Sequence, residues 1–271
     1  MSQPPTTPSA PTPSTGPDIS DTSHVRRSPQ HSPGESGHVS SRLVVGIVCA
    51  VLAVAVAVGV IVYALNSNSR QDAAPLTPPN ANPQGTGIIA NPGKASGQVP
   101  TLVVYQDYQC PACAYVESVI GQPLNSLADQ GKITLEYRTM TFLDTNLRND
   151  ASQRAAVAAA CADTVGHYRP YHDTVFANQP TTEGTGFTDQ QLRADFATQA
   201  GMSEGALTSF QQCYDHQRTD AFVQSVDRAA GQAGITGTPT LLVNGKPWDL
   251  GTVTSTDEAA LLQAITALAG N

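Results

Sequence analysis

Two cysteines separated by two residues, Cys110 and Cys113, stand where a predicted strand gives way to a predicted helix. The residues before them, 101–105, are apolar and β-branched, which is typical of a buried strand. The residues after them place apolar side chains at helical spacing over 112–120, so one face of a helix is apolar. A chain with this arrangement must begin its globular part as a strand, a tight turn and a helix that carries both thiols.

The start of a helix is a position that favours an ionised thiol. The first N–H groups of a helix have no partner within it and carry the positive end of its dipole. A cysteine at such a site can have its pKa lowered to roughly 3.5–7.5. We therefore predict that Cys110 is an exposed nucleophile, that Cys113 closes a disulfide with it, and that Pro111 occupies the first helical turn. Zinc sites use the same spacing, so the motif alone is moderate evidence.

A long apolar run precedes the globular part. Residues 43–65 contain no charged side chain, and at 1.5 Å per residue they span a hydrocarbon core of roughly 30 Å. Three arginines lie before the run and the first cation after it is Arg70, which predicts a cytoplasmic N-terminus. A single transmembrane helix is favoured over a cleaved signal peptide or a buried helix. Residues 1–42 are rich in Pro, Ser and Thr, so we predict a disordered cytoplasmic tail.

Charge and cysteine distribution agree with export of the part that follows. The chain has a net charge of −8, and the charges before the run cancel, so the excess of acidic residues lies after it. No basic patch is present to meet phosphates, which argues against nucleic-acid binding. Of five cysteines, Cys49 lies in the run and four lie beyond it, an even number as expected in an oxidising compartment.

The remaining chain predicts an extracytoplasmic linker and one α/β domain. Residues 66–96 are polar and Pro-rich, so we expect a flexible linker. Residues 97–271 then carry strand, helix and strand, a helical stretch at about 149–234, and finally two strands and a helix. Four strands are expected, at 101–105, 133–140, 239–243 and 246–250. The short connection between the first two predicts a parallel pair.

Three stretches give this order a family resemblance: 106–113 (QDYQCPAC), 171–178 (YHDTVFAN) and 234–240 (GITGTPT). The chain resembles the DsbA-like branch of the thioredoxin fold, in its membrane-anchored Gram-positive or actinobacterial form. The resemblance implies an α/β fold, β-α-β then β-β-α, with a helical insertion between the halves. It also implies a cis Pro239 beside the cysteines and a Thr238 backbone that receives an extended substrate; a trans proline on an edge strand is the alternative.

The sequence departs from this family at two positions. Ala112 stands where DsbA enzymes carry histidine, and alanine offers no hydrogen bond, so we expect a less extreme pKa for Cys110. Val104 stands where thioredoxin-like proteins often carry a buried acid. Asp107 is either a weaker substitute for that acid or a turn residue at the start of the helix.

The resemblance also implies that Cys161 and Cys213 form a structural disulfide, since some DsbA-like proteins of Gram-positive type carry this extra bridge. Two free buried thiols are the alternative. His167, His172 and His216 are interpreted as structural or surface residues, and no metal site is expected.

The function predicted from the resemblance is extracytoplasmic thiol–disulfide exchange, and a dithiol oxidase for exported proteins is favoured, which needs no cofactor besides the Cys110–Cys113 pair. Reduced exported proteins would be its substrates, and a membrane-embedded, quinone-linked reoxidase of the DsbB or VKOR kind its partner. A reductase or isomerase uses the same chemistry in another direction. A thioredoxin-fold binding module whose cysteines form only a staple is a further alternative.

Overall fold

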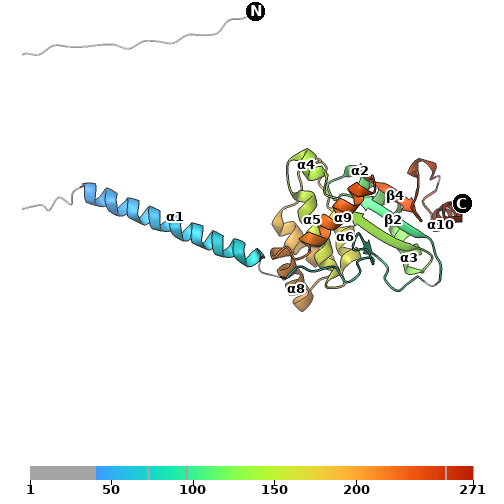
Figure 1. Cartoon of the computed structure of the whole chain (residues 1–271), viewed down its shortest axis with the longest axis horizontal. Coiled ribbons are helices and arrows are strands. Elements are labelled where there is room, and N and C mark those ends of the chain that lie inside the picture. The colour runs from blue at the N-terminus through green and yellow to red at the C-terminus, as the bar shows by residue number, and fades with distance from the viewer. Residues whose placement is uncertain (1–40, 72–73, 96, 254, 271) are drawn as a thin grey trace, which may run out of the picture. The chain divides into compact units, whose positions relative to one another are not determined.

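The computed structural model describes residues 41–71, 74–95, 97–253 and 255–270 (Figure 1). The predicted tail, 1–42, lies almost entirely outside these residues. An N-terminal unit holds the first part of helix α1, Ser41–Gln71, and a second unit holds the globular part. Along α1 the large apolar side chains from Val45 to Val62 are exposed.

The predicted membrane segment, 43–65, lies within α1, but the side chains of 43–44, 46 and 63–65 are outside the described residues. In the part of the chain that the structure describes, no helix combines the length and apolar character needed to cross a membrane.

The globular unit is built on a mixed five-stranded sheet with the order β1-β3-β2-β4-β5. Its strands are β1 (Ile88–Ile89), β2 (Thr101–Gln106), β3 (Thr134–Thr139), β4 (Thr240–Val243) and β5 (Lys246–Pro247). β2 pairs in parallel with β3 and antiparallel with β4, as the predicted β-α-β and β-β halves require. The last strand is shorter than the predicted 246–250 because the chain leaves the sheet after Pro247.

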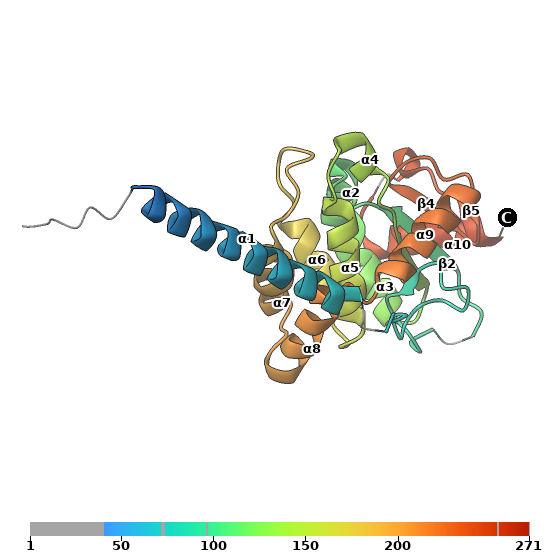
Figure 2. The ribbon, with the colours of Figure 1, turned by 60° about the vertical axis from the view of Figure 1, so that its left-hand side comes forward.

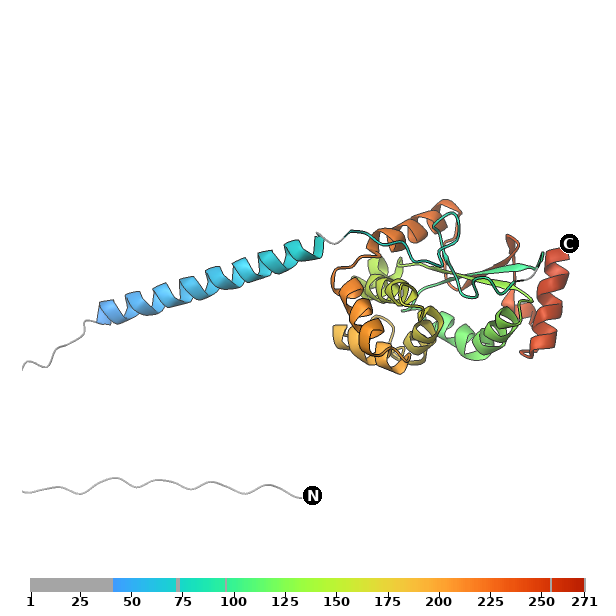
Figure 3. The same ribbon diagram turned by 90° about the horizontal axis from the view of Figure 1, so that it is seen from below.

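Helices cover both faces of this sheet (Figures 2 and 3). Successive side chains of a strand point to opposite faces, so Val103 and Tyr105 of β2 pack with Ala230 of α9, whereas Leu102 and Val104 join the main core on the other face. That core includes α3 and α10. The helices and helical turns are α2 (Pro111–Val116), η1 (Glu117–Gly121), α3 (Gln122–Asp129), α4 (Leu143–Leu147), α5 (Ala151–Asp163), α6 (Tyr168–Ala177), η2 (Gln191–Asp195), α7 (Phe196–Gln199), α8 (Glu204–Asp215), α9 (Asp220–Gln232), η3 (Leu250–Thr252) and α10 (Glu258–Gly270).

The helical insertion forms a small bundle whose centre is α5. Eleven residues of α5 are buried, most of them alanines, and small side chains let α6, α8 and α9 approach it closely. The insertion therefore packs beside the sheet and extends the same hydrophobic core. It carries both Cys161 and Cys213.

The prediction of a flexible linker over 66–96 is wrong from Leu76 onward, and residues 66–71 belong to α1. The Leu76 N–H donates to the Arg218 carbonyl, and Asn80 donates to the Asp163 carboxylate through both its backbone N–H, at 2.9 Å, and its side chain, at 2.8 Å. Ile88 and Ile89 then add strand β1 antiparallel to β3.

These contacts explain why a polar segment belongs to the domain. Asn82 donates to Glu136 at 2.7 Å, and the buried Asn91 amide donates to the Ala128 and Ile133 carbonyls. Each asparagine adds hydrogen bonds to buried polar groups of the domain, which offsets the entropy lost on ordering the segment. The globular domain thus begins before residue 97.

Candidate active site

The turn between β2 and α2 places Cys110 at the N-cap of a helix. Cys110 has extended backbone angles, and its N–H donates to the Asp107 carbonyl at 3.0 Å. Its own carbonyl accepts from the N–H groups of Cys113 and Ala114. Pro111 occupies the first turn, where its missing N–H leaves no bond unmade. The local geometry is the one predicted from the sequence.

The two thiols are free and differ slightly in accessibility. Cys110 is 8% exposed and Cys113 3% exposed, whereas Pro111 and Ala112 between them are exposed. Cys110 is therefore less exposed than predicted, because the turn and a loop of the second half cover part of its sulfur. An incoming sulfur would reach it across the exposed Pro111–Ala112 edge.

The covering loop is the one that carries Thr238 and Pro239. The Thr238–Pro239 peptide bond is cis, as the resemblance implies. The Cys110 sulfur lies 3.4 Å from the Thr238 carbonyl oxygen, across 128 residues of sequence, so the protonated thiol can donate to it. The buried Thr238 hydroxyl has no hydrogen-bond partner among the described residues. The fold thus brings four of the predicted site residues together: both cysteines, Thr238 and Pro239.

The surroundings of the two sulfurs separate their acidities. The pKa of Cys110 is lowered to about 6, chiefly by a hydrogen bond from the Cys113 thiol, with the backbone N–H groups of Cys113 and Ala112 adding to it against the cost of burial. Burial raises the pKa of Cys113, and the nearby Cys110 charge adds to that effect. At neutral pH Cys110 is the thiolate and Cys113 keeps its proton.

Asp107 is a buried acid beneath this turn. Its side chain is inaccessible to solvent, and it accepts hydrogen bonds from the Ser152 hydroxyl at 2.6 Å and the Gln109 N–H at 2.9 Å. Burial raises its pKa to about 7. The structure confirms that Asp107 is a turn residue at the start of the helix, since it accepts from the Gln109 N–H before α2. That its buried carboxyl substitutes for the acid missing at Val104, which lies in the apolar core, stays a prediction.

Two glutamines whose role sequence reasoning missed join the active-site turn to α4 and to the helical insertion. Gln179, just after α6, donates to the carbonyls of Tyr108 and Cys110 at 2.8 and 3.0 Å. Gln109 donates to Asp144 and Ser152. The sequence signals were positional: Gln109 lies within the 106–113 stretch, and Gln179 directly follows the 171–178 stretch. Neither residue belongs to a periodic pattern.

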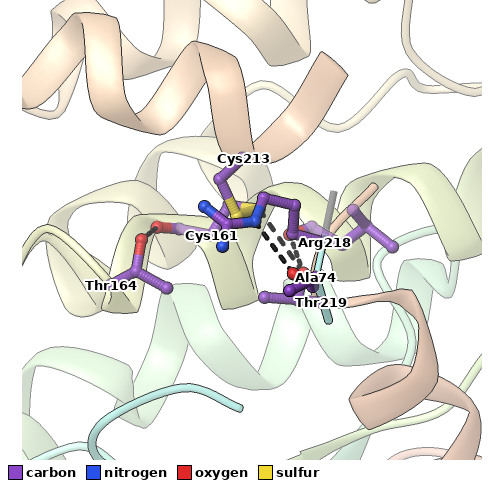
Figure 4. Close-up of a disulfide and its surroundings, with 7 residues drawn as sticks. Ala74, Cys161, Thr164, Cys213, Arg218 and Thr219 are labelled. Atoms are coloured by element: carbon purple, nitrogen blue, oxygen red, sulfur yellow. Dashed lines mark hydrogen bonds between the residues drawn. A yellow bond between two sulfur atoms is a disulfide. The ribbon is translucent and has the colours of Figure 1, made fainter. Parts of the chain in front are cut away.

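The second cysteine pair forms the disulfide that the resemblance implies (Figure 4). Cys161 of α5 and Cys213 of α8 are joined with Cα atoms 5.7 Å apart and are 0% and 2% exposed. Thr219 Oγ1 lies 3.4 Å from the Cys161 sulfur. Arg218 reaches the Ala74 carbonyl at 3.0 Å, so the segment before β1 is anchored close to this bridge.

Comparison with known proteins identifies the family to which this fold and site belong. A family model described as Thioredoxin matches residues 93–263, more than half of the chain. A strand–CxxC–helix turn closed by a cis-proline loop is the arrangement of a thiol–disulfide exchange protein, and the chain belongs to this thioredoxin family.

Solved structures show which members of the thioredoxin family this chain is similar to. DsbG of Mycobacterium tuberculosis in its reduced form has a TM-score of 0.55 and 25% identity, covering 70% of this chain and 90% of that one. Oxidised DsbA of M. tuberculosis gives 0.54 and 25%, with coverage of 68% and 93%. MdbA of Actinomyces oris, a thiol-disulfide oxidoreductase, gives 0.59 and 20%, with coverage of 73% and 94%, and shows the fold alone. The chain is a thiol–disulfide oxidoreductase of DsbA type, an enzyme class that works through a redox cysteine pair without a cofactor.

One curated protein also matches. The Na(+)/H(+) antiporter NhaA 3 of Salinispora tropica is 29% identical over 147 residues, which are 54% of this chain. The chain spans 20% of the length of that antiporter, so the transport activity in its name is not carried over.

Proposed function

We propose that this protein is an extracytoplasmic dithiol oxidase that forms disulfides in exported proteins through Cys110 and Cys113. The observation that carries the proposal is the position of Cys110 at the N-cap of α2, where the Cys113 thiol and the N–H groups of Cys113 and Ala112 lower its pKa. Stabilising the thiolate stabilises the reduced pair, and a pair that is stable when reduced takes electrons from its substrates.

The reaction starts from the Cys110–Cys113 disulfide. A substrate thiolate attacks the Cys110 sulfur; the S–S bond breaks, and Cys113 leaves with the electron pair and takes up a proton. A second substrate thiolate then attacks the substrate sulfur of the mixed disulfide and releases Cys110 as a thiolate. The substrate gains one disulfide and loses two electrons, which the cysteine pair now holds.

The backbone of the loop that carries Thr238 would guide the substrate. The Thr238 carbonyl lies 3.4 Å from the Cys110 sulfur and belongs to a half-buried segment, 237–240, at the edge of the site. An extended substrate strand laid along this segment would hydrogen-bond to its backbone and hold its own sulfur against Cys110.

The compartment is proposed from two features. A buried Cys161–Cys213 disulfide is typical of proteins in an oxidising compartment. The apolar run 43–65, with arginines on its N-terminal side, favours a single-pass anchor with a cytoplasmic N-terminus and an extracytoplasmic catalytic domain. Reduced exported proteins would be the substrates.

An oxidase must lose its two electrons again. We expect a membrane-embedded, quinone-linked reoxidase of the VKOR or DsbB kind to take them, and the anchor would keep the domain close to that partner. No nucleic acid and no separate cofactor enter this proposal.

The test is the reduction potential of the Cys110–Cys113 pair, measured on the full chain in detergent with glutathione buffers. We expect a value more positive than about −180 mV, on the oxidising side of protein disulfide isomerase and toward the roughly −120 mV of DsbA. A value near −270 mV, as in thioredoxin, would overturn the direction and make the protein an electron donor. Cys110→Ser with undiminished biological activity would instead favour the non-catalytic binding module.

A further inference from the structure

A cluster of three potential metal ligands lies between η1, which follows the active-site helix α2, and helix α6. Glu117 begins η1, the π-helical turn that continues α2, and His172 and Asp173 lie on α6. One ligand atom from each residue lies within 4.8 Å of the others. A π-helical turn is rare and is frequently found at functional sites.

The ring of His172 has a fixed orientation. It is fully buried, with its centroid 4.2 Å from that of Tyr137 and 5.1 Å from that of Phe176. Its Nε2 lies 3.1 Å from the Gln106 Oε1. The ring is thereby held between the Gln106 side chain at Nε2 and the Asp173 carboxylate at Nδ1.

Nδ1 is the ring nitrogen that faces two carboxylates. His172 Nδ1 lies 3.1 Å from Asp173 Oδ1 and 4.0 Å from Glu117 Oε1. Among the described residues, no lysine or arginine forms an ion pair with either acid. His172 Nδ1 and Asp173 Oδ1 are joined by a hydrogen bond, and a divalent cation would take the place of the proton between them and bring a further positive charge to Glu117.

Solvent can reach the cluster. A groove of about 250 Å³ separates η1 from α6, and Glu117 and Asp173 both line it. Ser118 and Gln122 add polar groups, whereas Ala114 and Phe176 form apolar walls. A hydrated ion entering this groove would meet the two carboxylates first and the imidazole behind them.

We propose that Glu117, His172 and Asp173 bind a divalent cation of the zinc type. One imidazole nitrogen and two carboxylate oxygens form a three-ligand set that leaves a position for water, as in many zinc sites. An imidazole ligand favours zinc-like ions over Mg²⁺ and Ca²⁺, which prefer oxygen alone. The bound ion would join the helix that carries Cys113 to the insertion, without touching the redox sulfurs.

The test uses zinc and the full chain with Cys110–Cys113 held as the disulfide, so that these thiols cannot bind the metal. A Cys49→Ala background removes the remaining free thiol. Calorimetric titration is expected to give a zinc-binding event that Asp173→Asn and Glu117→Gln each weaken at least tenfold. Glu183→Gln, which removes an exposed carboxylate outside the cluster, is the matched control and should bind as the parent does.

Two readouts keep the test decisive. Zinc should raise the unfolding temperature of the parent, since a ligand that binds only the folded state stabilises it, and should do so less in both variants. Asp173 is the more exposed of the two acids, and Glu117→Gln is isosteric, so one variant tests the site even if the other folds poorly. No zinc binding to the parent at 1 mM, or equal binding by the parent and both variants, would overturn the site. If the parent bound calcium as tightly as zinc, and the two variants lost the binding of both, the proposal of a zinc-type ion would be overturned.

Discussion

The two cysteine pairs of the globular domain lie at opposite ends of helices. Cys110 and Cys113 occupy the start of α2, whereas Cys161 and Cys213 lie in the last turns of α5 and α8. The N-terminal end of a helix is positive and stabilises a thiolate, and the C-terminal end is negative and disfavours one. The same side chain is therefore reactive in one pair and inert in the other.

Burial does not explain this difference. Cys110 and Cys113 are 8% and 3% exposed, and Cys161 and Cys213 are 0% and 2% exposed. The surroundings of the sulfurs differ: N–H groups, a second thiol and the Thr238 loop surround Cys110, whereas Cys161 lies among the alanines of α5 with the Thr219 hydroxyl 3.4 Å from its sulfur. Hydrogen-bond donors at the sulfur, more than accessibility, separate a redox site from a structural bridge.

The largest effect should come from removing the reactive sulfur. Cys110→Ser is expected to reduce thiol–disulfide exchange to the uncatalysed rate, because a hydroxyl does not ionise near neutral pH and forms no disulfide. Oxidation of a dithiol peptide, followed by fluorescence, measures this. Cys161→Ala/Cys213→Ala is the control and should retain the parent rate while folded; an equal loss in both would end the distinction between the pairs.

Removing the structural bridge should act on stability instead. The disulfide joins residues 52 apart, and in the chain-entropy model closing such a loop contributes about 4 kcal/mol. Cys161→Ala/Cys213→Ala should lower the free energy of unfolding by about that amount in urea titrations. A loss below about 1 kcal/mol would mean that the packing of α5 against α8 suffices without the bridge.

The proton equilibrium of Cys110 sharpens the comparison further. In the reduced chain, alkylation of Cys110 by iodoacetamide should fall as the pH is lowered through about 6, compared with 9.0 for an ordinary thiol. Because the pKa is lowered on folding, the stability of the reduced fold rises with pH between about pH 6 and 9. This added stability is complete above pH 9.0 and is lost once the pH has fallen through about 6. Mass spectrometry should find Cys113 unmodified over this range. A midpoint near 9 would contradict a stabilised thiolate.

Local patterns in the sequence were enough to predict most of the regular structure. The alternation in 133–140 predicted β3. The Thr188 to Gln191 spacing is that of a capping box, and the structure contains it: the Thr188 N–H donates to Gln191 Oε1 at 2.9 Å, and the Gln191 N–H donates to Thr188 Oγ1 at 3.2 Å. Each of these signals lies within one element, where neighbouring residues determine the outcome.

Contacts between distant residues were the part that sequence reasoning missed. Asn80 meets an acid 83 residues away and Asn82 meets one 54 residues away, so a Pro-rich segment typical of a linker became part of the sheet. Gln179 supports the active-site turn in the same way, from 69 residues beyond Cys110. Polar side chains that satisfy buried partners carry no periodicity, and their role appears only once the fold has brought the partners together.

The smallest predicted effect concerns the acid beneath the reactive pair. The pKa of Asp107 is raised from 3.8 to about 7 by burial, so its charged form is less stable in the folded protein than in the unfolded one. This cost is absent below pH 3.8, grows as the pH rises and is complete above pH 7. Between about pH 5.5 and 7 it should remove about 2 kcal/mol from the free energy of unfolding.

Asp107→Asn tests this because asparagine keeps an oxygen that can accept from the Gln109 N–H and has no carboxyl to ionise. Urea unfolding of the oxidised chain, in which Cys110 does not titrate, should show a smaller loss of stability between those two pH values in the variant than in the parent. Glu183→Gln, at an exposed carboxylate, should leave the parent's pH dependence unchanged. If Asp107→Asn leaves it unchanged as well, Asp107 is ionised throughout this range, and the negative charge beneath the turn would oppose the Cys110 thiolate at every pH at which the enzyme works.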